Sequence, residues 1–341
     1  MQMDGCTRIT TFTMSIQNDT EIVPFAEPLG LGGIAAKPPT LFLGQARAAE
    51  RFFDFFTANI RNRHTRRAYY NAACRFSEFC AERGVHNLAH VKPVHVAGYV
   101  ESLREGFAKP TIKQHLAAIR MLFDWLVVGQ IMEVNPAHAV RGPKHVVTKG
   151  RTPVLNREEA RALLSSIDTS TLTGLRDRAL IGIMIYTFAR VGAVLQMNVG
   201  DYFSQERRGW VRLHEKGGKE HEAPCVPKLE AYLDAYIAAA GIGNDKDGPL
   251  FRTTGRFTGK PHRMTQQDGY RMIQRRARQA GIKTRIGNHS MRATGITDYL
   301  KSDGTLEHAQ TMAAHSSPRT TKLYDRRNDE TALDEYAKVR I

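Results

Sequence analysis

The chain has 341 residues, of which 42% are hydrophobic, and its formal net charge at pH 7 is +15. This length suits two domains, and this apolar fraction can form buried cores, so a wholly disordered chain is excluded. The large positive charge favours a polyanionic partner, because phosphates that are neutralised by lysine and arginine release their condensed counterions.

Nothing in the sequence indicates a membrane or secretory protein. The longest apolar run, residues 179–189, is interrupted by Thr187 and is too short to span a bilayer, and the N-terminus lacks a secretory signal pattern. The cysteines form neither a CxxC pair nor a disulfide framework (Cys6, Cys74, Cys80, Cys225). We therefore expect a cytoplasmic protein.

The first half of the chain divides into a tail and a helical domain. Residues 1–44 are rich in Gly, Pro, Thr and Ser, which predicts a mobile tail; their net charge is −2, so the rest of the chain carries +17. Apolar residues then recur at helical spacing, and the short connections predict one compact helical domain over residues 45–140. The predicted helices lie near 46–59, 64–83, 93–105 and 110–128.

Residues 141–153 break the helical pattern with two glycines and two prolines, which predicts a linker between domains. The linker is basic, so it either lies in solvent or runs along DNA. Its basic residues are Arg141, Lys144, His145 when protonated, Lys149 and Arg151.

Residues 154–328 predict a second domain that is mainly α with a small antiparallel β-sheet. It opens with Asn156 and Glu159 at capping-box spacing. Residues 209–226 predict two strands around the turn Gly217-Gly218. The predicted helices lie near 157–166, 173–197, 227–240, 264–280, 288–301, 305–314 and 318–325, with a last one near 329–339.

Several polar residues in this domain are candidates for chemistry. Arg190 lies in an apolar run with no acid between Asp177 and Asp201, so it is a candidate anion ligand; a structural salt bridge, or a packed stem with a solvated head, is the alternative. Lys216 and Lys219 flank the predicted turn, where a lysine is either simply solvated or acts as a general acid.

The remaining candidates lie near the C-terminus. His289 and Arg292 share one face of a predicted helix, where they either clamp phosphate oxygens or are surface neighbours by coincidence. His315 and Tyr324 are nine residues apart, so one straight helix would turn them to different sides. Ser316-Ser317-Pro318 predicts a new short helix after His315, which would carry Tyr324 back towards the histidine.

In this order and spacing, the candidates resemble the tyrosine recombinase (phage integrase) family over about residues 46–330. The resemblance implies a helical, SAM-like core-binding domain followed by a tyrosine-recombinase catalytic domain with the DNA breaking-rejoining fold. It implies a site-specific recombinase that acts through a 3′-phosphotyrosine intermediate and a Holliday junction, with no metal, ATP or other cofactor. The implied catalytic residues are Arg190, Lys216, His289, Arg292, His315 and Tyr324.

The same resemblance implies partners. These are double-stranded recombination sites, further copies of the chain in a homotetramer, and possible accessory proteins. Residues 329–341 would form a C-terminal helix that docks on a neighbouring subunit, with packing onto its own domain as the alternative. The expected DNA contacts are Arg66, Arg67, Lys113, Arg120, Lys144, Lys149, Arg151 and Lys219.

The sequence also departs from the family pattern. Ala193 stands where the family often has an acid three residues after its first arginine, and Glu215 stands where a glycine usually precedes the lysine. Ala313-Ala314 replaces a common Leu-Gly before His315. Two rival functions remain open: a type IB topoisomerase, and a DNA-binding regulator that has kept the fold and lost catalysis.

Overall fold

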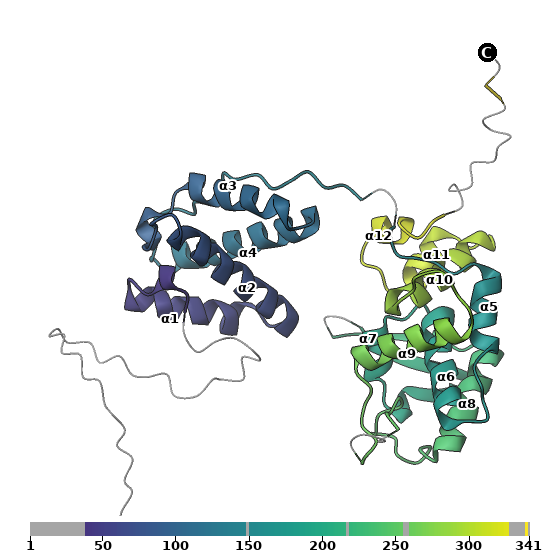
Figure 1. Cartoon of the computed structure of the whole chain (residues 1–341). Helices are drawn as coiled ribbons and strands as arrows, with labels where there is room; N and C mark the ends of the chain where they lie inside the picture. The colour runs from purple at the N-terminus through teal and green to yellow at the C-terminus, as the bar shows by residue number, and fades with distance from the viewer. Residues whose placement is uncertain (1–37, 148–149, 216–217, 255–258, 327–337, 340–341) are drawn as a thin grey trace, which may run out of the picture. The chain divides into compact units, whose positions relative to one another are not determined.

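The computed structural model describes residues 38–147, 150–215, 218–254, 259–326 and 338–339 (Figure 1). The chain divides between Val146 and Val147 into two compact units, each with its own core. Most described residues are helical and one small antiparallel sheet is present, as the sequence predicts. No described helix has the length and apolar character needed to cross a membrane.

The first unit is all-helical in its described part. Local chemistry sets the helix starts: the side chain of Asn62 accepts hydrogen bonds from the N–H groups of His64 and Thr65, and Pro93 is the first residue of its helix. The helices are α1 (Ala46–Asp54), α2 (Arg63–Ala81), α3 (Pro93–Ser102) and α4 (Lys109–Val128), with short turns at Thr40–Phe42, Leu88–His90 and Leu103–Glu105.

Two details of this unit differ from the sequence prediction. A π-helical turn, Phe55–Asn59, follows α1, so the helix expected over 46–59 is regular only to Asp54. Leu41 and Phe42 are buried in the core, although the predicted tail extends to residue 44. An apolar run as short as residues 41–43 has no periodicity, so only its tertiary packing shows this role. Residues 1–37 lie outside the described part of the chain.

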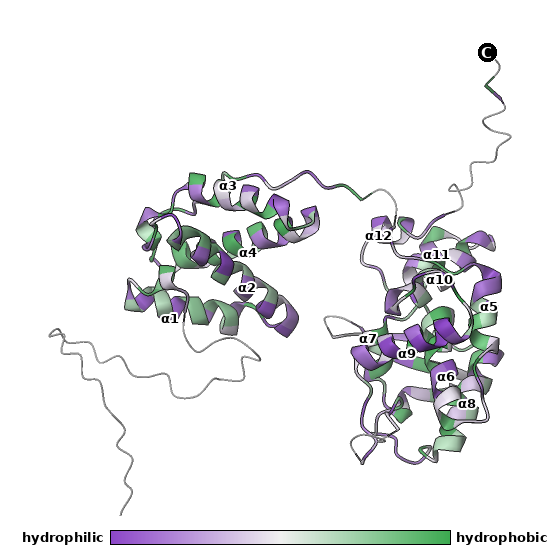
Figure 2. Ribbon diagram, in the orientation of Figure 1, coloured by the Kyte–Doolittle hydropathy of each residue, from purple (hydrophilic) through white to green (hydrophobic). Residues whose placement is uncertain are grey.

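Aromatic side chains dominate the core of the first unit. Phe52, Phe56 and Tyr70 pack edge to face or tilted, and Phe76 contacts Tyr99 in the same way. Hydrophobic and hydrophilic residues alternate along α2 and α4, as expected for helices with one face in a core (Figure 2).

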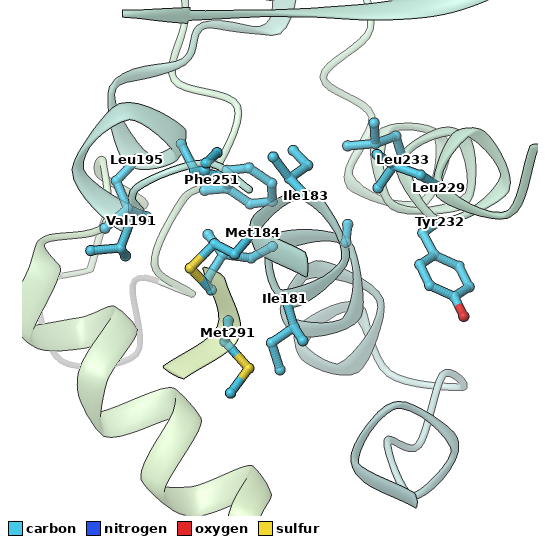
Figure 3. Packing of buried hydrophobic residues seen from close by; sticks show 14 of the residues in the cluster. Ile181, Ile183, Met184, Val191, Leu195, Leu229, Tyr232, Leu233, Phe251 and Met291 are labelled. Atoms are coloured by element: carbon cyan, nitrogen blue, oxygen red, sulfur yellow. The ribbon is translucent and has the colours of Figure 1, made fainter. Parts of the chain in front are cut away.

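The second unit packs its other elements around α6. Figure 3 shows Ile181, Ile183 and Met184 of α6 among buried side chains of neighbouring elements, including Phe251 and Met291. The helices are α5 (Arg157–Ser165), α6 (Leu172–Tyr186), α7 (Val191–Gln196), α8 (Pro227–Ala240), α9 (Gln266–Gln279), α10 (Asn288–Lys301), α11 (Leu306–Met312) and α12 (Pro318–Lys322), with a 3-10 turn at Val199–Asp201.

The sheet contains one strand more than the sequence predicts. Its order is β1 (Tyr202–Gln205), β2 (Arg208–Glu215) and β3 (Lys219–Pro224), all antiparallel, with Val211 opposite Ala223. The β1–β2 turn consists of Glu206 and Arg207, both with positive φ (51° and 64°). Such turns usually carry Asn or Gly, so this one has no sequence signal.

The single helix predicted over residues 173–197 is wrong, because the chain breaks between α6 and α7. Phe188 has φ of 55°, and the hydroxyl of Thr187 donates to the carbonyl of Ile183, which caps the end of α6. No glycine or proline marks the break. Its consequence is that Arg190 lies at the N-cap of α7, not inside a helix.

Candidate active site

Arg190 projects from the break between α6 and α7. Its Nη1 lies 2.5 Å from Oε2 of Glu215, the last residue of β2. The side chain of Arg190 is 37% exposed, whereas that of Glu215 is only 5% exposed. The local sequence offered no acid, but the fold supplies one from 25 residues later, so the structural salt bridge is present. The outer side of the guanidinium remains accessible.

Arg292 lies on α10 and is 2% exposed. Its guanidinium donates to the carbonyl oxygens of Phe188 and Ala313, so the left-handed residue in the α6–α7 break presents a carbonyl to this arginine. Burial, and then the positive charge of Arg190, lower the pKa of Arg292 to about 10, while Tyr324 and Glu215 act in the opposite direction. Arg292 therefore stays charged at neutral pH.

His289 lies one turn before Arg292, at the beginning of α10. The start of the helix is fixed by Ser290, whose hydroxyl accepts a hydrogen bond from the N–H of Gly287. His289 is exposed, but the protein atoms around its ring lower its pKa, and Arg292 and Arg190 lower it as well. This imidazole is therefore biased towards its neutral form beside two cations.

His315 is 7% exposed and lies in the loop between α11 and α12. Its Nδ1 is 2.9 Å from the hydroxyl of Thr321, and its ring stacks on that of Tyr324 with centroids 5.7 Å apart. Burial lowers the pKa of His315 to about 4, with Arg292 and Arg190 as further causes. Ala314 before it has φ of 46°, a conformation that favours glycine.

Tyr324 lies in the turn after α12, two residues beyond its end at Lys322, so the prediction that a helix over 318–325 carries it is wrong. Its ring packs against a small apolar cluster that contains Phe188 and Ile296. Its carbonyl accepts a hydrogen bond from the hydroxyl of Thr297 on α10. The break between α11 and α12 thus returns the tyrosine to His315, as the proline signal predicted.

The structure therefore brings five of the six catalytic candidates together. Arg190 and Arg292 each perturb the pKa of other members of the group, and Tyr324 raises the pKa of Arg292. Lys216 lies outside the described residues, as does the side chain of Lys219, which begins β3. Glu215 and Thr321 are the site residues that the sequence did not single out for chemistry; an acid at a charged turn and a threonine in a short helix are ordinary features.

The side chains that we expect to contact DNA differ in how accessible they are. The exposed residues are Arg67, Lys113, Lys144 and Arg151. Arg66 is half-buried and donates from Nε to the carbonyl of Ile60, 3.0 Å away. Arg120 donates to the carbonyls of Ala137 and Val140, so its guanidinium is engaged by its own unit. Lys149 lies outside the described residues.

The linker contacts the segment that carries the tyrosine. The N–H of Gly150 donates to the carbonyl of Leu323, the neighbour of Tyr324. Arg326 reaches back and donates from Nη2 to the carbonyls of Gly150 and Thr152. The catalytic-unit end of the linker is therefore attached to the chain on both sides of Tyr324.

Two arginines and two histidines around a tyrosine, on a mainly helical unit with a small sheet, define an enzyme of the DNA strand-breaking and rejoining class. Residues 153–331 match the model of the phage integrase family, and residues 49–129 match its N-terminal SAM-like domain. The chain belongs to the phage integrase family. It is a tyrosine recombinase, which breaks and rejoins DNA strands.

Known relatives agree with this assignment. The chain is 28% identical to tyrosine recombinase XerC of Chlamydia caviae, over 66% of this chain and 70% of the relative. It is 27% identical to tyrosine recombinase XerD of Mycobacterium leprae, over 76% of this chain and 86% of the relative.

Solved structures share the fold. XerH bound to a palindromic difH substrate, in a post-cleavage complex, matches 80% of this chain and 79% of its own with a TM-score of 0.66 and 22% identity. A lambda integrase tetramer bound to a Holliday junction matches 81% and 75% with a TM-score of 0.61 and 16% identity.

Proposed function

We propose that this enzyme recombines specific DNA sites with Tyr324 as its nucleophile. The observation that carries the assignment is the placement of the Tyr324 side chain: its ring stacks on that of His315, and it lies close enough to Arg292 to raise the pKa of that arginine. Oη of Tyr324 attacks the scissile phosphorus and forms a phosphotyrosine bond to the 3′ side of the break. The bond between phosphorus and the 5′ oxygen breaks, and the reverse reaction with a 5′ hydroxyl from another duplex joins the strands.

Arg190 and Arg292 stabilise the extra negative charge that develops on the phosphate in the transition state. Both are placed before substrate arrives, Arg190 by Glu215 and Arg292 by two backbone carbonyls. Fixed cations lower the barrier more than mobile ones, because no reorganisation is needed during the reaction.

The histidines and the lysine handle protons and phosphate oxygens. The lowered pKa of His289 suits it to accept the proton of Tyr324 as attack begins. His315 is neutral at pH 7, and since Nδ1 is bonded to Thr321, its Nε2 is left to contact the phosphate. Lys216 gives a proton to the departing 5′ oxygen, with Lys219 as the alternative donor.

The partners are two double-stranded recombination sites and three further copies of the chain, which exchange strands through a Holliday junction. The lambda integrase tetramer on a Holliday junction and XerH on its substrate support this assembly. The exposed basic residues of the first unit and the linker would grip DNA backbones, with residues 329–341 docking on a neighbouring subunit. Accessory proteins would act on the assembled complex. Because the proposed substrate is DNA, we expect the enzyme to act in the cytoplasm.

The test uses nicked suicide duplexes tiled across the DNA on either side of the gene, in which a cleaved fragment diffuses away and traps the adduct. We expect a covalent protein–DNA adduct with the wild type and none with Tyr324→Phe. An adduct that persists in Tyr324→Phe contradicts the nucleophile. Binding without an adduct on every duplex favours the regulator, and relaxation of supercoils without sequence preference favours the topoisomerase.

A further inference from the structure

The acid at the end of β2 does not contact the substrate in the mechanism above, yet it is ion-paired with a catalytic candidate. Glu215 is an ion-pair partner of Arg190 at 2.5 Å, and its carboxylate is almost fully buried. Burying an unpaired carboxylate costs free energy of folding. The burial of Glu215 therefore depends on its pairing with Arg190.

The exposure of the two side chains shows where the carboxylate lies. Glu215 is 5% exposed and Arg190 is 37% exposed, so the carboxylate lies on the inner side of the guanidinium. A guanidinium has five N–H donors in a fixed planar fork. The contact with Glu215 engages Nη1, which leaves donors on the solvent side for a phosphate. The acid and a phosphate can therefore bind Arg190 together, from opposite sides.

The charge of Glu215 also matters to the second arginine. Arg190 lowers the pKa of Arg292 through repulsion, and Glu215 raises it. Before DNA binds, this carboxylate is the anion that partly offsets two neighbouring cations. A site with two arginines and no such anion would hold the arginines apart or shift one towards its neutral form.

We propose that Glu215 is a positioning residue, which holds the guanidinium of Arg190 in place for the scissile phosphate. The inference rests on the proposed function. It also gives the departures at residues 193 and 215 a common explanation. Ala193 lies three residues after Arg190 on α7, is 4% exposed and has no charge to offer. The support for Arg190 comes from the strand instead of from its own helix.

The decisive variant is Glu215→Gln, which keeps the size of the side chain and removes its charge. We expect adduct formation under single-turnover conditions to slow about 10- to 100-fold, because a small misplacement of a catalytic group has an effect of this size. DNA affinity in a gel-shift titration should change less than about twofold, since most backbone contacts are elsewhere. Activity at alkaline pH should also fail at a lower pH than in the wild type, because the pKa of Arg292 falls.

Glu222→Gln is the matched control. Glu222 is on β3 of the same sheet and pairs with Arg212 at 3.0 Å, but its side chain is 43% exposed. We expect this variant to keep the wild-type rate. Addition of Ala193→Asp to Glu215→Gln should restore part of the rate, because the N-cap residue and the third residue of a helix are neighbours and the new carboxylate can reach Arg190 from α7.

The rate of Glu215→Gln can contradict the positioning role of Glu215 and still leave the proposed function intact. Adduct formation by the wild type, and its absence in Tyr324→Phe, tests the function alone. A wild-type rate in Glu215→Gln overturns the positioning role. A faster rate means that Glu215 holds Arg190 away from phosphate. A slower rate accompanied by an equal loss of DNA binding and a lower Tm means that the pair only supports the fold.

Discussion

At the scale of single residues, His315 combines burial with two cationic neighbours. These lower its pKa to about 4, so the ring is neutral in the working enzyme. Its Nδ1 is hydrogen-bonded to Thr321, and the face of its ring stacks on that of Tyr324. A neutral ring can lie against the phenol without a charge that would compete with Arg292 for the same phosphate. The two arginines, not the histidines, therefore supply the fixed positive charge.

This pKa makes the stability of the second unit depend on pH. Since the pKa of His315 is about 4 in the folded state, against 6.5 for an unperturbed histidine, the unfolded chain binds the proton more tightly. The free energy of unfolding should therefore fall as the pH drops from about 6.5 to about 4, by up to about 3 kcal/mol from this residue. Urea unfolding across this range measures it.

His315→Asn should make that pH dependence shallower. His308→Asn is the control, because His308 is exposed on α11 of the same unit and should leave the slope as it is. An unchanged slope in His315→Asn would show that other groups carry the pH dependence. The comparison uses slopes, so a uniform loss of stability in either variant does not affect it.

At the scale of elements, the sequence predicts regular helices well and their interruptions poorly. The helix over Pro227–Ala240 and the helix over Asn288–Lys301 have the predicted bounds, because a proline or a polar cap marks their beginnings. The break after Tyr186 has no such marker: Thr187 and Phe188 leave the helix because of tertiary packing and a side-chain hydrogen bond. The predicted last helix near 329–339 falls almost entirely outside the described residues.

The candidate site shows the same division. Its residues could be proposed from order and spacing, because those survive without knowledge of the fold. The groups that hold these residues in place could not be proposed in this way. Glu215 is distant from Arg190 in sequence, and only the strand brings the two together. The carbonyl of Phe188 becomes a partner of Arg292 only because the backbone there is left-handed.

The buried anion that joins α6 to α9 gives a prediction at this scale. Asp177 is fully buried, and its two oxygens accept hydrogen bonds from Arg176, Arg275 and Arg276 at 2.7 to 3.1 Å. Asp177→Asn removes the charge and leaves three arginines facing one another. We expect a loss of about 3–5 kcal/mol in the free energy of unfolding, measured by urea titration.

Asp298→Asn provides the comparison. Asp298 pairs with Arg157 at 2.8 Å, but both side chains are about half exposed. An exposed pair of this kind is worth about 0–1 kcal/mol, so this variant should unfold close to the wild type. Equal effects of the two substitutions would show that the buried pairing contributes no more than the surface one.

At the scale of the whole molecule, charge and chemistry are divided between the two units. Outside residues 1–44 the chain carries a net charge of +17, and this charge is spread over both units and the linker. The described catalytic candidates, in contrast, all lie in the second unit. The contact of Arg292 with Tyr324 is made within one chain, so each subunit has the means to attack with its own tyrosine.

This arrangement predicts cleavage in cis, which mixed assemblies can test. Tyr324→Phe lacks the proposed nucleophile and Arg292→Ala lacks an arginine of the proposed phosphate clamp, so each variant alone should form no adduct. If the tyrosine acts within its own subunit, a mixture of the two is also inactive, because no chain contains both groups. If a neighbour supplied the tyrosine, some subunits in the mixture would combine an intact Arg292 with an intact Tyr324, and adduct would reappear. Wild type mixed with Tyr324→Phe is the control and should form adduct through its wild-type subunits. We expect the mixed variants to remain inactive while both bind DNA, since Arg292 and Tyr324 of one chain already lie close enough to interact.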